Sequence, residues 1–267
     1  AEPPMQPMLN IAIRAAHKAG DFIVRKINKL PDLKVEVKAP NDFVSEVDRQ
    51  AESLIIEELL KAFPNHGILA EESGVIEGSD DFRWIIDPLD GTTNYLHGFP
   101  HYAVSIACEH EGRLQHAAIY DPFKQELFAA SRGDGATLNN RRLRVASLKT
   151  TQGALLATGF PFRHPEQLDD FLHTFSAFFK KASDVRRAGS AALDLAYVAA
   201  GRLDGYWESG LQAWDMAAGA LIVREAGGLA TDFSGDTNFL ETGDVVAGNP
   251  RIIGDMLRTL ELTTGKR

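Results

Sequence analysis

A short apolar run that ends in two acids constrains this chain more than any other part of its sequence. Residues 84–94 read WIIDPLDGTTN, so a hydrophobic segment passes directly into a polar turn. The apolar residues 84–86 predict a buried strand. Pro88 has no backbone N–H and a fixed φ, which predicts that regular strand pairing stops there. Asp87 and Asp90 should therefore lie at the end of a buried strand.

The polar half of this stretch predicts a site for a cation and an anion together. Gly91 permits a sharp turn or the close approach of a ligand. Thr92 and Thr93 are expected to cap a short helix whose first N–H groups point outward. Carboxylates suit Mg²⁺ and a helix start suits phosphate, which indicates metal-assisted chemistry on a phosphate ester. The alternative is a solvated turn, because all these residue types form turns.

Composition narrows the class of protein. A chain of 267 residues can form one large domain or two tightly packed halves. Its net charge of −9 argues against non-specific binding to nucleic acid or to an anionic membrane. The sequence shows no concentrated basic pocket, so bound cations are expected to offset a phosphate. No apolar run reaches the roughly 20 residues that a membrane-spanning helix needs.

Cys108 is the single cysteine, which excludes an intramolecular disulfide and a cysteine-based zinc site and fits a reducing cytosol. It lies in an apolar run, so a buried, inert thiol is expected. His97 and His101 are separated by Gly98 and Pro100, which deny them a shared helical face and argue against a zinc pair.

The first part of the chain reads as helix, flap and helix. Helical spacing covers residues 7–28 and Pro31 ends it. Residues 32–43 alternate as a hairpin or flap that turns at 40–42 and carries Lys38, either a solvated lysine or a contact to an active site. Ser45 and Asp48 form a capping pattern that opens a second helix, and capping alone is the default role of Asp48.

A second apolar strand that ends in acids follows at residues 68–72. If it lies beside residues 84–87, Glu71 reaches the same cation as Asp87; adjacent carboxylates repel unless a cation lies between them. A polar loop is expected at 73–82. Strands at 102–108, 114–120 and 126–130 predict a meander, and residues 142–145 a further short strand.

The second half predicts strands and helices in alternation. Strands are expected at 153–157, at Val185, and at 204–208, 229–233 and 244–248. Helices are expected at 165–180, from residue 190, at 216–226 and at 250–262. Ser190 and Asp215 lie at helix starts, where capping and ligand binding are both open interpretations.

The acids at strand ends and helix starts together predict one metal site. The set comprises Glu71, Asp87, Asp90 and Asp215, with Asp48 behind them. Two or more Mg²⁺ ions roughly 4 Å apart would activate a water and stabilise the departing alkoxide. Oxygen ligands favour Mg²⁺ or Mn²⁺ over zinc. The absence of a P-loop argues against a nucleotide-driven kinase, and the absence of a G-x-S-x-G motif argues against a serine nucleophile of that type. The acids therefore indicate a metal-dependent phosphomonoester hydrolase.

With these residues identified, the sequence resembles the inositol monophosphatase family, and within it the bacterial extragenic-suppressor type. The likeness spans about residues 8–260. It is carried by the segments AEES at 70–73, WIIDPLDGTTN at 84–94, GSAA at 189–192, WDMAAG at 214–219 and VAGN at 246–249. The second and fourth segments, in this order and spacing, make the resemblance specific.

The resemblance implies an α+β fold layered α-β-α-β-α, in a single domain at residues 5–263. Its subdomains would be a metal-binding α+β part at 5–147 and a substrate-side α/β part at 148–263; residues 1–4 are expected to be a cloning remnant. The implied activity is inositol-1-monophosphatase, with Mg²⁺-dependent hydrolysis of myo-inositol phosphates and inhibition by Li⁺. A cytoplasmic homodimer is expected. Bacterial relatives of this type also imply contacts with transcription proteins in antitermination.

The resemblance also implies roles for individual residues. A first metal would be bound by Glu71, Asp87 and the Leu89 carbonyl, a second by Asp87, Asp90 and Asp215, and a weaker third would contact Glu71. Thr92, hydrogen-bonded to Asp48, would position and activate the nucleophilic water together with Glu71. Lys38 would lie on the flap near the site. The implied substrate-binding residues are Asp90, Gly91, Thr92, Gly189, Ser190, Ala191, Glu208 and Asp215.

Two alternatives stay open at this point. A sister phosphatase of fructose 1,6-bisphosphate, an adenosine bisphosphate or histidinol phosphate shares the metal motif, and broad specificity is compatible with it. A protein-binding antitermination factor, in addition to or instead of catalysis, is the alternative of another class.

Overall fold

The computed structural model describes residues 7–27, 35–39 and 42–265. The expectations for residues 1–4, for a helix stop at Pro31 and for the flap turn at residues 40–41 lie outside the described residues. None of the helices within these ranges combines the length and apolarity needed to cross a membrane.

The first half of the chain forms a sheet of eight strands in the order β10-β9-β8-β7-β6-β5-β3-β4. Its strands β3 and β5 pair parallel, and its other neighbours pair antiparallel. Its strands are β3 (Gly67–Ala70), β4 (Gly74–Ile76), β5 (Phe82–Asp90), β6 (Ala103–His110), β7 (Arg113–Asp121), β8 (Glu126–Ser131), β9 (Gly135–Leu138) and β10 (Arg141–Arg142).

Helices and a flap accompany this sheet. Helices α1 (Pro7–Lys26) and α2 (Glu46–Ala62) pack on one face, and the short α3 (Thr92–Leu96) follows β5. The predicted flap is an antiparallel pair of β1 (Val35–Ala39) and β2 (Asp42–Ser45).

The second half forms a mixed sheet of five strands in the order β12-β11-β13-β15-β14. Its strands are β11 (Leu155–Thr158), β12 (Asp184–Arg186), β13 (Gly205–Glu208), β14 (Leu229–Thr231) and β15 (Val245–Gly248). Its helices are α4 (Leu168–Phe179), α5 (Ala191–Ala199), α6 (Ala213–Glu225), α7 (Phe239–Thr242) and α8 (Pro250–Thr264), and a 3₁₀ turn at Pro165–Gln167 precedes α4.

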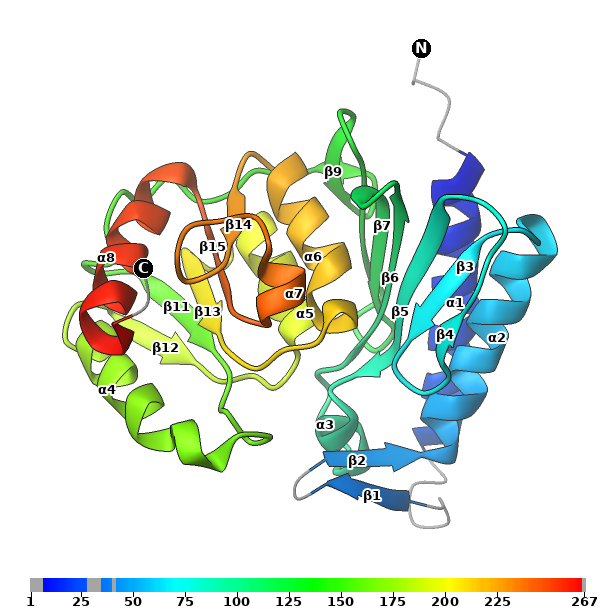
Figure 1. Ribbon diagram of the computed structural model, residues 1–267, viewed down its shortest axis with the longest axis horizontal. Helices are drawn as coiled ribbons and strands as arrows, with labels where there is room; N and C mark the ends of the chain where they lie inside the picture. The colour runs from blue at the N-terminus through cyan, green and yellow to red at the C-terminus, as the bar shows by residue number, and fades with distance from the viewer. Residues whose placement is uncertain (1–6, 28–34, 40–41, 266–267) are drawn as a thin grey trace.

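The elements stack in five layers, which confirms the predicted α-β-α-β-α order (Figure 1). Helices α1 and α2 cover the outer face of the first sheet, around buried Ile55 and Trp84. Helices α5 and α6 fill the space between the sheets, around Leu195 and Leu221. Helices α4 and α8 cover the second sheet. Burial on both faces explains why the central strands read as continuous apolar runs.

Several local expectations were wrong. The predicted loop at 73–82 contains β4, a three-residue edge strand whose Val75 is exposed, so no burial pattern marks it. Strand β9 and helix α7 were not predicted. The strand expected at 142–145 is confined to Arg141–Arg142, because the Val145 N–H donates to the Ala226 carbonyl and not to the sheet. The boundary predicted at 147/148 falls between β10 and β11, which belong to different sheets.

Candidate active site

Parallel pairing of β3 and β5 brings the two acid-terminated strands together. Ala70 lies opposite Ile86, and the Glu71 N–H donates to the Ile86 carbonyl at 3.1 Å. Because the two strands run in the same direction and Ala70 pairs with Ile86, the next residues, Glu71 and Asp87, lie side by side. The expected adjacency of the two apolar runs is confirmed.

An irregularity at the end of β5 places Asp87 and Asp90 on one site. The ladder to β6 slips between these two residues and resumes where Asp90 faces Ala103. Regular pairing therefore stops at Pro88, as expected, but the strand resumes beyond the irregularity and continues to Asp90. In a regular strand, residues three apart face opposite sides. The irregularity removes that alternation.

Gly91, rather than either threonine, occupies the N-cap position of α3. Its φ of 94° is left-handed, and a Cβ there would lie 3.0 Å from the His101 carbonyl oxygen. The predicted capping by Thr92 and Thr93 was wrong, because no side chain caps this helix. The Thr92 hydroxyl instead contacts the Asp48 Oδ1 at 2.8 Å and the Leu89 carbonyl at 3.1 Å.

Asp48 caps its own helix and also contacts Thr92. Its Oδ2 accepts the Ser45 N–H at 2.8 Å and the Ser45 hydroxyl, completing the predicted capping box of α2. Burial raises the pKa of Asp48, while the hydrogen bonds from Ser45 and Thr92 oppose that rise. Its second oxygen links α2 to the loop after β5.

Asp90 joins the two halves of the chain at the start of α5. Its Oδ2 accepts the Ser190 hydroxyl at 2.6 Å and the Ala192 N–H at 2.7 Å. Ser190 is also the N-cap of α5, accepting the Leu193 N–H at 3.3 Å. The capping interpretation of Ser190 is therefore confirmed, and its hydroxyl also contacts an acid of the candidate site; its binding of a ligand stays a prediction.

Asp215 reaches the same acids from α6. Its Oδ2 accepts the Gln212 N–H at 2.7 Å, so it too belongs to a capping box. Carboxylate oxygens of Asp87, Asp90 and Asp215 all lie within 4.8 Å of one another. Arg163 also lies near this residue, with its Nη1 4.0 Å from the Asp215 Oδ2.

The electrostatics of this group favour a bound cation. Burial, and then the charges of Glu71, Asp90 and Asp215, raise the pKa of Asp87 well above its usual range. Burial is also the main reason why the pKa of Glu71 rises to about 7 and that of Asp90 to about 6. An oxygen-only group of mutually repelling, buried carboxylates fits one or more divalent cations, which would reverse these shifts.

Lys38 of the flap contacts the acids at the end of β3. Its Nζ lies 3.4 Å from the Glu71 Oε1 and 2.5 Å from the Glu72 Oε1. Between the two interpretations of Lys38, the contact to the candidate site is the one that the geometry supports. The neighbouring carboxylates raise the pKa of this lysine against the opposing effect of burial.

A cavity of about 240 Å³ connects the acids with the second half of the chain. Apart from Asp48 and Lys38, which contact its lining residues, the predicted site residues all line it: Glu71, Asp87, Leu89, Asp90, Gly91, Thr92, Gly189, Ser190, Ala191, Glu208 and Asp215. Glu208 accepts a hydrogen bond from the Tyr206 hydroxyl, and burial raises the pKa of Glu208 to about 7.

Sequence reasoning missed three charged residues of this cavity: Arg163, Arg187 and Asp194. The two arginines are 24 positions apart in the sequence and come together only in the fold, where they lie among the acids that line the same cavity. The guanidinium of Arg187 lies over the Phe160 ring at 4.8 Å. Asp194 follows Ser190 by one helical turn, a spacing that could have indicated a shared face.

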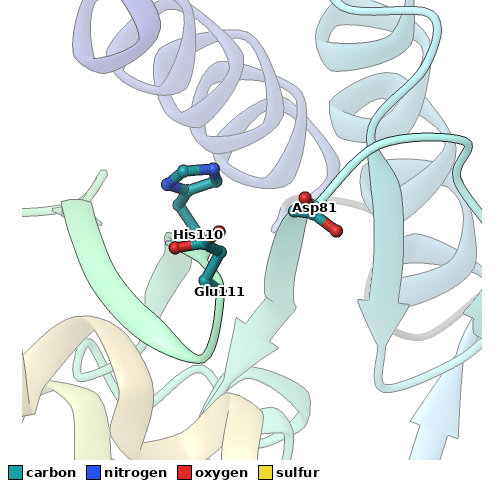
Figure 2. Close-up of side chains that lie close together, drawn as sticks. All are labelled: Asp81, His110 and Glu111. Carbon is teal, nitrogen blue, oxygen red and sulfur yellow. The ribbon is translucent and has the colours of Figure 1, made fainter.

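A second group of potential ligands lies outside this cavity. Asp81 precedes β5, and His110 and Glu111 lie at the turn between β6 and β7 (Figure 2). One potential ligand atom from each lies within 4.8 Å of the others. Asp81 and Glu111 are exposed and His110 stacks on Phe82, so this group has the features of a solvated surface cluster. Cys108, in contrast, is buried as predicted, and burial raises the pKa of its thiol to about 12.

Comparison with known proteins places the chain among close relatives. The profile of the inositol monophosphatase family matches residues 4–262. The chain is 56% identical to the Nus factor SuhB of Pseudomonas aeruginosa, across 96% of this chain and 97% of that protein. Among solved structures it resembles the extragenic suppressor protein suhB of Bartonella henselae, with 47% identity, a TM-score of 0.93 and coverage of 96% and 99%. It also resembles the inositol monophosphatase of Anabaena, with 39% identity, a TM-score of 0.86 and coverage of 96% and 95%.

Proposed function

The chain belongs to the inositol monophosphatase family, and from this premise we propose that it is a Mg²⁺-dependent phosphomonoester hydrolase acting on myo-inositol 1-phosphate and related polyol phosphates. The observation that carries the proposal is the convergence of Asp87, Asp90 and Asp215 within 4.8 Å at the wall of the cavity. Proteins rarely bury several carboxylates together without a cation or a proton to offset their charge.

The donor set suits hard cations at two neighbouring positions. Glu71, Asp87 and the Leu89 carbonyl would hold one Mg²⁺, and Asp87, Asp90 and Asp215 a second, with a weaker third at Glu71. Mn²⁺ would substitute, and Li⁺ would inhibit, as the family leads us to expect. Bound there, the cations would supply an activated water and charge stabilisation for the leaving oxygen.

Thr92 and Asp48 would position the attacking water. Because Asp48 accepts a hydrogen bond from the Thr92 hydroxyl, the lone pairs of that oxygen point elsewhere and can accept a hydrogen bond from water. Glu71, which lines the same cavity, would accept the proton that the water loses. These three residues make up the proposed catalytic set.

The other half of the cavity would hold the ester. The backbone at Gly91 and Thr92, and at residues 189–191 where α5 begins, offers N–H groups to the phosphate. Glu208 would accept a hydrogen bond from a hydroxyl of the alcohol. The single domain at residues 5–263, with its two subdomains, is proposed to be the catalytic unit.

A phosphate-release panel tests the proposal. Inositol 1-phosphate, fructose 1,6-bisphosphate, adenosine 3′,5′-bisphosphate and histidinol phosphate would be compared with Mg²⁺ and with a chelator. We expect Mg²⁺-dependent release, highest from inositol 1-phosphate. A higher kcat/KM for one of the other esters would identify a sister phosphatase, and release that persists in the chelator would contradict the metal mechanism.

A second proposed function, compatible with the first, is a contact with transcription proteins in antitermination. It is supported by the description of the 56% identical Pseudomonas aeruginosa relative as a Nus factor. We further propose a cytoplasmic homodimer, and the net charge of −9 disfavours direct binding to RNA. Asp87→Asn tests the separation of the two roles: a cellular phenotype that survives the loss of hydrolysis belongs to binding, and one that disappears with it belongs to catalysis.

A further inference from the structure

Asp194 lies on the wall of the cavity without an assigned role. It belongs to the first half of α5, and its backbone N–H donates to the Ser190 carbonyl at 2.9 Å. The residue is only 2% exposed and lines the cavity together with Glu208. Buried carboxyl groups almost always accept hydrogen bonds from the protein, so the surroundings of this one are informative.

No hydrogen bond from a described residue reaches the carboxyl group of Asp194. The buried side-chain atoms that lack a partner in residues 7–27, 35–39 and 42–265 belong to His101, Tyr102 and Trp214, so the Asp194 oxygens are not sealed inside the core. Carboxyl oxygens that line a cavity and accept no hydrogen bond from the described residues are available to a molecule bound in that cavity. Glu208 differs, because it already accepts the Tyr206 hydroxyl.

The charges around Asp194 exclude an anionic group as its ligand. Burial, and then the charges of Glu208 and Asp90, raise its pKa well above the usual range, and Arg187 opposes the rise. A phosphate or carboxylate would add a further negative charge to this group. A neutral hydroxyl can donate one hydrogen bond to a carboxyl oxygen and adds no charge. The carboxyl groups of Asp194 and Glu208, which line the same cavity, therefore suit an alcohol with several hydroxyls.

We propose that Asp194 is a specificity-determining residue that accepts a hydrogen bond from a hydroxyl of the substrate's alcohol, next to the hydroxyl bound by Glu208. This inference rests on the proposed phosphatase function and narrows its substrates to phosphate esters of polyols with at least two free hydroxyls. Esters whose alcohol part has no free hydroxyl form no hydrogen bond with Asp194, so their binding does not depend on it.

Two substitutions at Asp194 and two substrates test this. Asp194→Leu keeps the branching at Cγ and removes both acceptors, whereas Asp194→Asn keeps one. For inositol 1-phosphate we expect KM to rise by about tenfold or more in the leucine variant, because a lost hydrogen bond leaves a substrate hydroxyl without a partner, and by less in the asparagine variant, which keeps one acceptor oxygen. For phenyl phosphate, which has no hydroxyl, kcat/KM should stay within twofold. Glu109→Gln is the matched control, a carboxyl that is 8% exposed and lies outside the cavity.

The outcomes separate this inference from the proposed function. Equal losses on both substrates, or an unchanged KM for inositol 1-phosphate, would overturn the role of Asp194 while hydrolysis by the wild type stands. If the wild type releases no phosphate from either ester, calorimetry of inositol 1-phosphate binding decides. If the leucine variant binds inositol 1-phosphate more weakly than the wild type, the role of Asp194 is supported although the proposed hydrolysis fails. If the two proteins bind it equally, both the role of Asp194 and the proposed function are rejected.

Discussion

Replacing Asp87 by asparagine should barely change the stability of the metal-free protein. Two unit charges 4.8 Å apart repel by about 3.5 kcal/mol at an effective dielectric constant of 20, so the pairs with Asp90 and Asp215 would cost about 7 kcal/mol if all three were ionised. The fold avoids this repulsion by keeping a proton on Asp87, whose pKa lies well above its usual range. Asparagine imitates that neutral form, so we expect the free energy of unfolding in a chelator at pH 7 to change by less than about 1 kcal/mol.

The same substitution should remove the response to Mg²⁺. At a hundred times its dissociation constant, a ligand stabilises the folded state by about 2.7 kcal/mol. For a chain of this size that raises the melting temperature by about 5–10 °C. The Asp87→Asn side chain has no charge to offer a cation shared between two positions, so we expect a gain below about 2 °C. Phosphate release should fall by at least about a hundredfold.

Thermal unfolding followed by circular dichroism over a Mg²⁺ titration, with phosphate release on the same samples, provides the measurement. Asp121→Asn is the control, because Asp121 is equally buried but binds the Phe123 and Lys124 N–H groups away from the cavity. Its melting temperature should rise with Mg²⁺ as much as that of the wild type. The reasoning is refuted if Asp87→Asn melts with the wild-type Mg²⁺ increment or retains wild-type turnover.

Three further predictions concern pH, the flap and the turn after β5. In a chelator, the free energy of unfolding in urea should fall between pH 5 and 8, by about 3 kcal/mol for each of Glu71 and Glu208. The reason is that a carboxyl whose pKa is raised to about 7 in the folded protein stabilises the fold only while it is protonated. A free energy of unfolding that rises over this window contradicts the assignment. Lys38→Met should lower the Mg²⁺ concentration needed for half-maximal phosphate release severalfold, because the lysine ammonium no longer competes with Mg²⁺ for Glu71. If this variant instead needs more Mg²⁺, the lysine organises the site. Gly91→Ala should cost about 1–3 kcal/mol in urea unfolding, because alanine is strained at φ 94° and meets the His101 carbonyl; an unchanged midpoint contradicts this.

Local sequence patterns predicted the parts of the site that depend on neighbours along the chain. The apolar runs before Glu71 and Asp87 marked strands, and capping patterns located the starts of α2, α5 and α6. They failed at Thr92, because the competing contact to Asp48 is 44 residues away and invisible to a capping pattern. They predicted the end of regular pairing at Pro88, but not that the strand resumes at Asp90 beyond the irregularity.

Contacts between distant parts of the chain decided the rest. The Ala192 N–H that binds Asp90 lies 102 residues away, and Arg163, Arg187 and Asp194 reach the cavity from separate elements of the second half. Each of these residues has an ordinary local setting: an arginine in a loop, an arginine after a strand, and an aspartate in a helix. Nothing in their immediate sequence distinguishes the two arginines from solvated surface residues, whereas the spacing of Asp194 from Ser190 could have indicated a shared helical face.

The sequence alone determined which residues end the strands, where the helices begin, and that carboxylates gather in a chain with a surplus of acids. Periodicity and capping are short-range properties, so they are present in any window of a dozen residues. Only the tertiary structure decided that β3 lies parallel to β5, that the irregular end of β5 turns Asp87 and Asp90 to one site, and that α5 and α6 bring Asp194 and Asp215 to the same cavity. These depend on how two sheets pack around shared helices, a balance of burial over the whole core that no local pattern contains.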